Sequence, residues 1–155
     1  MDMSIALQRQ GHRLLQIGVA LFLFTSFEGF AIPYLAAPLL GRSTHTLSAF
    51  LGLILLTFGL VWPRLRLGAA ASRIAFWFLI YSGLAITAAF FLAGIWGAGR
   101  STMPLAGAPL GSAFQEMVVM AVAYSSAPTG ITSFALILWG LRTGPFADGL
   151  GHDGE

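Results

Sequence analysis

The stretch IAFWFLIYSGLAITAAFFLAGIW, residues 74–96, decides the fold because it contains no charged residue and is longer than a bilayer core is thick. A helix rises about 1.5 Å per residue, so roughly 20 apolar residues cross a hydrocarbon core of about 30 Å. Backbone polar groups inside lipid must be bonded within their own segment, which favours a helix. We therefore predict a transmembrane helix over residues 74–96.

Three further apolar runs indicate that the chain crosses a membrane four times. We predict helices over about residues 14–32, 46–62 and 114–141, in addition to 74–96. Pro33 and Pro63 follow the first two runs, and proline stops a helix because it lacks the backbone donor. No run alternates apolar and polar residues as the strands of a membrane barrel do. The expected fold class is all-α, an integral membrane four-helix bundle that forms one domain over residues 1–142.

The composition of the whole chain agrees with this prediction. Of its 155 residues, 57% are hydrophobic and 9% are charged, whereas soluble domains have about 45–50% apolar and about 25% charged residues. This much apolar surface also excludes a disordered chain. The chain has no cysteine, which excludes thiol catalysis and cysteine-ligated metals. It has no basic run that would bind nucleic acid, and no phosphate-binding glycine motif.

Glycine and proline mark the segments between the runs. Pro38 and Gly41 are expected in a short link between the first two helices. Residues 97–111 are rich in both residue types, and we predict a flexible loop there, with a folded lid over a cavity as the alternative. Residues 143–155 are Gly-rich and acidic, which predicts a mobile cytoplasmic tail.

The arginines predict the orientation in the membrane. Two arginines, Arg42 and Arg100, fall on one side of the predicted helices. Six fall on the other side: Arg9, Arg13, Arg64, Arg66, Arg73 and Arg142. Cytoplasmic loops carry the excess of positive charge, so both termini are expected in the cytoplasm.

Glu28 is the sharpest functional signal in the sequence, because it lies inside an apolar helix. Such a carboxylate costs at least ~2.5 kcal/mol and usually faces the bundle interior with a partner. Two interpretations stay open, a functional carboxylate and a neutral acid bonded to serine or threonine. The topology places Glu28, His45, Arg100 and Glu116 in or near the outer leaflet.

His45 and Glu116 each have a structural and a functional interpretation. His45 is expected at the start of the second helix, where it is either an interfacial residue or a ligand. One histidine can hold a haem iron, whereas zinc needs more ligands. Glu116 stands in a first helical turn, where it favours the helix dipole. For His45 to form a functional site, its imidazole must point into the helix bundle and contact an acidic side chain in a water-poor cavity.

Pro128 interrupts the fourth run within the segment YSSAPTG, residues 124–130. The proline frees a backbone carbonyl, which neighbouring hydroxyl groups can compensate. The segment is either a structural kink or a bend that opens a pocket lined by Tyr124 and the hydroxyls. Small residues at intervals of four predict close helix contacts: Ser48 and Gly52, then Ala85, Ala89, Ala93 and Gly97.

Several short segments together resemble the hydroxylaminobenzene mutase family, which is related in architecture to the styrene oxide isomerases. HTLSAFLG (45–52) and GLVWPRL (59–65) resemble that family's second helix. Further matching segments are AFW (75–77), WGAG (96–99), MPLAG (103–107) and LWGLR (138–142). The resemblance covers roughly residues 10–142, nearly the whole chain.

The resemblance implies an isomerase that rearranges a small aromatic substrate. The mutases convert arylhydroxylamines to ortho-aminophenols, and the isomerases convert aryl epoxides to aldehydes. In the isomerases a haem b acts as a Lewis acid, and His45 matches its ligand position. The resemblance also implies a multi-pass protein of the bacterial inner (cytoplasmic) membrane that forms homo-oligomers, and the isomerases themselves form trimers.

This chain departs from the family at three polar positions. Leu51 and Ile86 stand where asparagine is usual, and Phe90 matches a tyrosine of the epoxide isomerases. Three alternatives follow: other residues supply the polar groups around the substrate oxygen, the substrate differs, or the chemistry is lost. The candidate catalytic residues are Glu28, Tyr81, Ser82, Tyr124 and Glu116.

Two other functions compete with an isomerase. One is a non-catalytic haem-binding or accessory membrane protein, and the other is a small transporter with Glu28 on its solute path.

Overall fold

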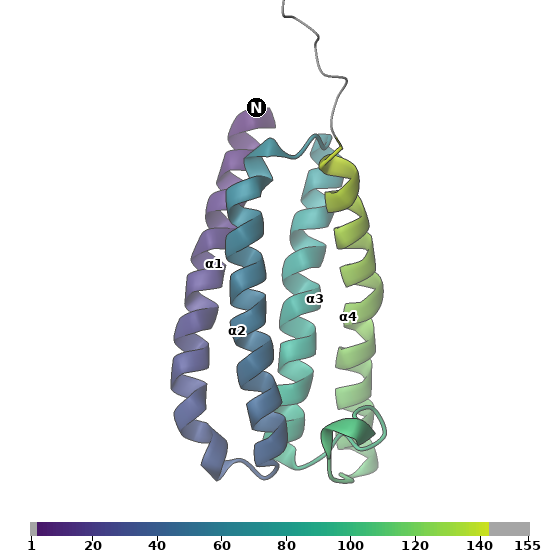
Figure 1. Ribbon diagram of the computed structural model, residues 1–155. Helices are drawn as coiled ribbons and strands as arrows, with labels where there is room; N and C mark the ends of the chain where they lie inside the picture. The colour runs from purple at the N-terminus through teal and green to yellow at the C-terminus, as the bar shows by residue number, and fades with distance from the viewer. Residues whose placement is uncertain (1–2, 143–155) are drawn as a thin grey trace, which may run out of the picture.

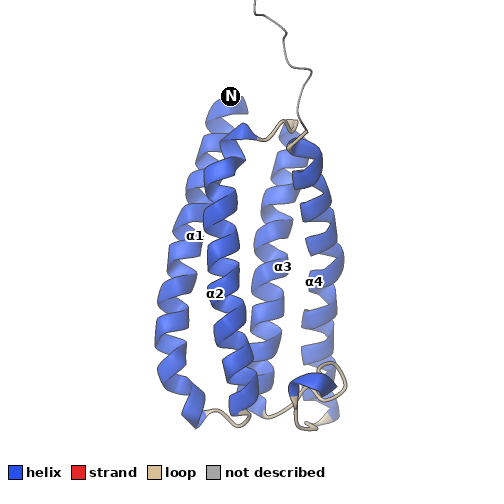
Figure 2. Ribbon diagram, in the orientation of Figure 1, coloured by secondary structure: helices blue, strands red, loops and turns tan. Residues whose placement is uncertain are grey.

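Four long antiparallel helices make up nearly all of the computed structural model, which describes residues 3–142. They are α1 (Met3–Ala31), α2 (Pro38–Val61), α3 (Ala69–Trp96) and α4 (Ala113–Gly140). Short 3-10 helices follow the first three of them, at Ile32–Tyr34, Trp62–Arg64 and Pro104–Ala106. Figure 2 shows no strand in the described part of the chain. The prediction of an all-α fold with four helices long and apolar enough to cross a membrane is confirmed.

Three helices begin earlier than the hydropathy predicts, namely α1, α2 and α3, and α3 starts at Ala69 and not at residue 74. α1 starts at Met3 and not near residue 14, because no proline separates its polar first turns from the apolar run. α2 starts at Pro38 and not near residue 46. Proline suits the first turn of a helix, where its missing donor would be unbonded anyway. Pro38 and Gly41 therefore belong to α2 and not to the link. The tail predicted over residues 143–155 lies outside the described residues.

The helices pack as two close pairs (Figure 1). α1 packs along α2, and α3 packs along α4, whereas α2 and α3 share a smaller contact. Among the described residues, α1 and α4 make no contact. The bundle is therefore open on the side between its first and last helices.

Glycine explains the close approach of α1 and α2. A Cβ atom added to Gly11 would lie 2.7 Å from the carbonyl oxygen of Gly59, and one on Gly18 would lie 2.9 Å from that of Gly52. The predicted contact stripe at Ser48 and Gly52 is confirmed, since both are buried on α2. On α3 a second predicted stripe is also buried at Ala85, Ala89 and Ala93. Its last member, Gly97, ends the helix instead, with a left-handed φ of 61°.

The two ends of the molecule differ in their connections. The N-terminus and the end of α4 lie at one end in Figure 1, together with the α2–α3 connection. There Trp62 is fully buried, and its Nε1 donates to Gln10 Oε1 at 2.9 Å. The α1–α2 and α3–α4 connections lie at the opposite end. We refer to the first as the terminal end and the second as the loop end.

Candidate functional site

Glu28 and His45 meet at the loop end, where α1 and α2 lie side by side. The Nδ1 atom of His45 is 3.2 Å from Oε2 of Glu28. The Glu28 side chain is 1% exposed and the His45 side chain is 43% exposed. The partner of the buried carboxyl group is therefore a histidine, and not the serine or threonine of the neutral-acid interpretation.

The local sequence makes room for this contact. Gly29 follows Glu28, and a Cβ atom there would lie 3.2 Å from Cε1 of His45. The absence of a side chain at Gly29 thus lets the imidazole lie against α1. About one turn further into the helix pair, Thr25 and Ser48 share a hydrogen bond of 2.8 Å. Two polar contacts therefore fix the register of α1 against α2 around His45.

The geometry leaves one nitrogen and one oxygen of the pair unused. In the tautomer that carries its proton on Nδ1, the imidazole donates to Oε2 and keeps a lone pair on Nε2. The other carboxyl oxygen, Oε1 of Glu28, is buried and has no hydrogen-bond partner. A carboxylate that holds one ring nitrogen fixes the tautomer and orientation of a ligating histidine. The contact with Glu28 therefore leaves Nε2 of His45 free to act as a ligand or a proton acceptor.

The expected enclosed chamber around His45 is not found in the single chain. The imidazole meets its acidic neighbour as predicted, but almost half of its side chain is exposed. The main pocket of the described residues lies elsewhere, and neither His45 nor Glu28 lines it. The imidazole contacts Glu28 and lies against Gly29 of α1, so it faces the contact between α1 and α2 and not the pocket between α2, α3 and α4.

Glu116 does not join this pair, because its carboxylate organises the α3–α4 connection. Oε1 accepts from the backbone N–H groups of Gly99 at 2.7 Å and Gly111 at 2.9 Å, and from Arg100 at 3.3 Å. Oε2 accepts from Ser101 N–H at 2.9 Å. Both oxygens are thus occupied by the loop backbone. The prediction of a flexible loop is wrong: this connection is folded around a buried carboxylate.

We predict that Glu116→Gln destabilises the fold by about 2–4 kcal/mol, because hydrogen bonds to charged groups contribute about 1.5–3 kcal/mol each and an amide cannot accept at both positions. The measurement is the thermal unfolding midpoint in detergent. Arg42→Gln, which removes an exposed charge at the same end, is the control and should unfold like the wild type. An unchanged midpoint in Glu116→Gln would contradict the assignment.

The remaining candidates lie on α3 and α4, away from the pair. Tyr81 shares a hydrogen bond of 2.8 Å with Ser125 at an exposed position. Tyr124 is 60% exposed. The Ser82 hydroxyl donates to the Leu79 carbonyl of its own helix at 3.1 Å. Of these candidates only Ser82 lines the main pocket.

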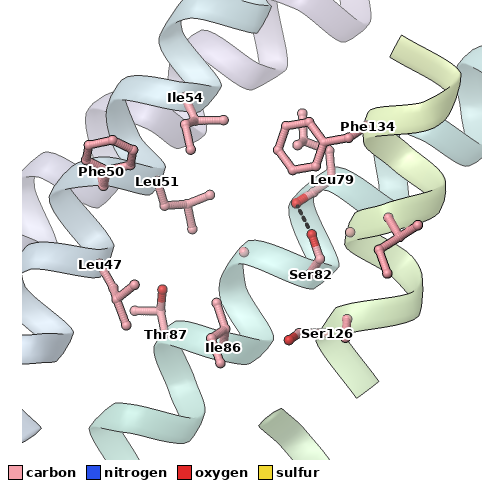
Figure 3. A pocket seen from close by; sticks show the side chains of 14 residues that line it. Leu47, Phe50, Leu51, Ile54, Leu79, Ser82, Ile86, Thr87, Ser126 and Phe134 are labelled. Atoms are coloured by element: carbon pink, nitrogen blue, oxygen red, sulfur yellow. Dashed lines mark hydrogen bonds between the residues drawn. The ribbon is translucent and has the colours of Figure 1, made fainter. Parts of the chain in front are cut away.

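That pocket opens between α2, α3 and α4 and has a volume of about 600 Å³ (Figure 3). It borders the proline-containing part of α4 at Ser126 and Gly130, but Tyr124 does not line it. Leu51 and Ile86, where the resemblance expects asparagine, both do. The lining is otherwise mainly apolar: Leu47, Phe50, Ile54, Leu79, Gly83, Ala127, Ile131 and Phe134, with Ser82 and Thr87.

Sequence reasoning missed Thr87. Its residue is 5% exposed, it lines the pocket, and its hydroxyl has no hydrogen-bond partner. Threonine is common in membrane helices, where its hydroxyl can bond to a carbonyl of the preceding turn. No feature of the sequence distinguishes Thr87 from those threonines, so only coordinates reveal it.

Comparisons with known proteins agree with the resemblance seen in the sequence. The styrene oxide isomerase family matches residues 10–142. The chain is 43% identical over 134 residues to hydroxylaminobenzene mutase HabB of Ectopseudomonas oleovorans, covering 86% of this chain and 82% of that protein. It is 32% identical over 125 residues to hydroxylaminobenzene mutase HabA of the same organism, covering 80% and 93%. No solved structure matches.

Proposed function

Because the chain belongs to the styrene oxide isomerase family, we propose that it is a membrane-embedded enzyme that rearranges an arylhydroxylamine to an ortho-aminophenol. Membership of the family makes the chain an isomerase. Two relatives named hydroxylaminobenzene mutases favour an arylhydroxylamine over an aryl epoxide as the substrate. In the proposed reaction the N–O bond breaks and a C–O bond forms at the ortho carbon. That carbon loses a proton and the nitrogen gains one, so substrate and product have the same formula.

The observation that carries the proposal is the Glu28–His45 pair. A carboxyl group buried in apolar helices is costly, and such groups mark functional sites by default. Here it holds one face of an imidazole whose other nitrogen is free. Water would compete as a nucleophile, and the burial of the Glu28 side chain, which is 1% exposed, keeps water from the carboxyl end of the pair.

The residues present also fit a haem. An axial histidine needs a free ring nitrogen and a hydrogen-bond acceptor on the other, and His45 with Glu28 supplies both. His45 would hold the iron through Nε2, and Glu28 would orient the ring. Bound haem would supply a Lewis acid for the oxygen of the substrate. Since the ring is partly exposed, a second copy of the chain is a suitable cover, which supports a homo-oligomer.

The surface supports the membrane placement. Large apolar side chains are exposed on all four helices, for example Phe30 at 80%, Leu60 at 67% and Leu138 at 73%. Exposed apolar surface of this extent needs an apolar surrounding. We place the terminal end, with its six arginines, in the cytoplasm of a bacterial inner membrane. The loop end with Glu28 and His45 then lies near the outer leaflet.

The test is conversion of phenylhydroxylamine by the purified protein. We expect 2-aminophenol as a product of unchanged mass, identified by chromatography and mass spectrometry, at a rate proportional to protein. Detergent without protein is the control for spontaneous rearrangement. Styrene oxide is assayed in parallel, because conversion of the epoxide alone would replace the proposed substrate. Conversion of neither compound would overturn the proposed function.

A further inference from the structure

The N-terminal half of α1 carries an exposed polar face toward the terminal end of the molecule (Figure 1). Its side chains surround an open hollow of about 490 Å³, which five residues line: Gln8, Arg9, His12, Arg13 and Gln16. All five side chains are polar, whereas the pocket between α2, α3 and α4 is mainly apolar. The Glu28–His45 pair lies at the loop end, so the proposed reaction does not explain this face.

The two arginines of this face have no carboxylate partner among the described residues. Those residues contain two acids, Glu28 and Glu116, and both lie at the loop end. Arg9 and Arg13 are four residues apart, so their side chains are neighbours on the helix surface. Like charges at this spacing repel each other, and an anion held between them would relieve the repulsion. The face therefore offers a site for an anion.

The length of α1 places this face at the membrane surface. The helix has 29 residues, which at about 1.5 Å per residue gives a length of about 44 Å. The hydrocarbon core of a bilayer is about 30 Å thick, and the bilayer with its headgroup layers is about 40–45 Å thick. The apolar run that begins at Leu14 fills the core, so the polar turns before it lie among lipid headgroups.

Beyond Gln16 the same face of α1 stays exposed but becomes apolar. Residues spaced three and four apart lie on one face of a helix. From Arg9 this spacing continues through a series of exposed residues: Arg13, Gln16, Ala20, Leu23 and Phe27. The opposite face of the helix is buried, for example at Leu14 and Leu21. A charged section followed by an apolar section matches a phospholipid, in which the phosphate precedes the acyl chains.

Other partners fit this face less well. A soluble phosphate would use the arginines but not the apolar section. A second copy of the chain that presented the same face would bring like charges together. A zwitterionic lipid carries an ammonium group, which the guanidinium groups repel. An anionic phospholipid uses both sections of the face and adds no positive charge.

We propose that Arg9 and Arg13 bind the phosphate of an anionic phospholipid of the phosphatidylglycerol type, whose acyl chain lies along the exposed apolar section of α1. Guanidinium groups bind phosphate oxygens through paired hydrogen bonds. Gln8 and Gln16 supply amide donors for further headgroup oxygens. Basic pockets at the cytoplasmic ends of membrane helices bind such headgroups. The proposal rests on the proposed membrane placement and not on the rearrangement reaction.

The test is a lipid titration of the detergent-purified protein, read by native mass spectrometry, with phosphatidylglycerol and phosphatidylcholine of identical acyl chains. We expect the wild type to bind phosphatidylglycerol more tightly. Arg9→Gln combined with Arg13→Gln should lower this preference about 25-fold, because each basic residue contributes about 5-fold in affinity for anionic lipid. Arg66→Gln combined with Arg73→Gln removes the same charge from the same end and is the matched control, which should keep most of the preference.

Two further measurements separate the site from general effects. A phosphatidylglycerol with a photoreactive diazirine in its acyl chain should crosslink to the exposed apolar section of α1, near Leu23. Arg9→Lys combined with Arg13→Lys keeps the charge but not the planar fork, so it should keep part of the preference. Glutamine forms helices well and both positions are exposed, so the unfolding midpoint of the glutamine variant without added lipid should equal that of the wild type.

Four results would overturn the proposal. Equal affinity of the wild type for the two lipids would show that the face does not select an anionic headgroup. Equal loss in the matched control would show that net charge, and not this face, determines binding. Crosslinks confined to α2, α3 or α4 would place the lipid elsewhere. Lipid preference that appears only when Asp148→Asn, Asp153→Asn and Glu155→Gln are combined would show that the acids of residues 143–155 compete for the arginines. Failure to convert phenylhydroxylamine, by contrast, would overturn the proposed function and leave the lipid results unaffected.

Discussion

Alanine in place of His45 is expected to lower the kcat for phenylhydroxylamine rearrangement by about 10²- to 10⁴-fold, the range that loss of one positioned catalytic group produces. The physical reason is the free Nε2 atom. Within residues 3–142 His12 is the other histidine, and it lies two to three turns from the N-terminal end of α1, far along the chain from Glu28. Within that range, therefore, no other imidazole can take the place of His45 against that carboxylate.

The same substitution has a spectroscopic result that does not depend on turnover. We expect wild-type protein produced with ample haem and purified in detergent to show a Soret band, and His45→Ala to lose it. His12→Ala is the matched control and should keep both the band and the activity. A colourless, active wild type would remove haem from the proposal while leaving His45 its catalytic role. Full activity in His45→Ala would contradict the assignment of the site.

The helices were predictable because the apolar runs are long and the chain has few charges. The bilayer thickness fixes the length of a span, and residues 74–96 satisfy it without interruption. The same signal failed at three helix starts, those of α1, α2 and α3, because hydropathy marks where a helix is apolar and not where its hydrogen bonding begins. The polar residues before Leu14 continue α1, and Pro38 opens α2.

The contact of Glu28 with His45 was partly predictable for a topological reason. Antiparallel helices joined by a short connection place residues near that connection at similar depth. The sequence therefore indicates that the two residues share a layer. It does not indicate which way the ring faces, because that depends on the contact geometry of α1 and α2 at Gly29.

Glu116 and Thr87 show what the sequence does not contain. Glu116 shares the layer of Glu28, but its partners are backbone N–H groups of the loop, which carry no residue signature. Thr87 is recognised in the structure because its buried hydroxyl group has no hydrogen-bond partner. Both features depend on the packing of neighbouring segments and not on residue type.

Glutamine in place of Glu28 should lower the kcat about 10- to 100-fold, the usual effect of altering a group that holds a ligating histidine, with little change in expression or unfolding midpoint. Glutamine has nearly the same shape, and its side-chain oxygen still accepts from Nδ1 of His45. The fold and the orientation of the ring are therefore kept. What is lost is a carboxyl group that, when ionised, favours the imidazole proton on Nδ1 and makes Nε2 a stronger donor of its lone pair.

The readouts must distinguish this effect from simple destabilisation. We expect a fall in kcat with little change in KM, because Glu28 is buried and acts through His45. A shift of the Soret maximum in haem-loaded Glu28→Gln would report the change at Nε2 directly, which a purely structural residue would not produce. Glu28→Asp keeps the charge on a shorter side chain and should recover part of the lost rate.

Glu116→Gln is the matched control for this prediction, since it neutralises the other carboxylate of the loop end. The two buried acids should give opposite results. Glu116→Gln lowers the unfolding midpoint but leaves the kcat of the folded fraction near the wild-type value, because its oxygens bond the loop backbone. Glu28→Gln lowers the kcat but leaves the midpoint nearly unchanged. If Glu28→Gln unfolds early and its folded fraction is fully active, Glu28 only joins α1 to α2.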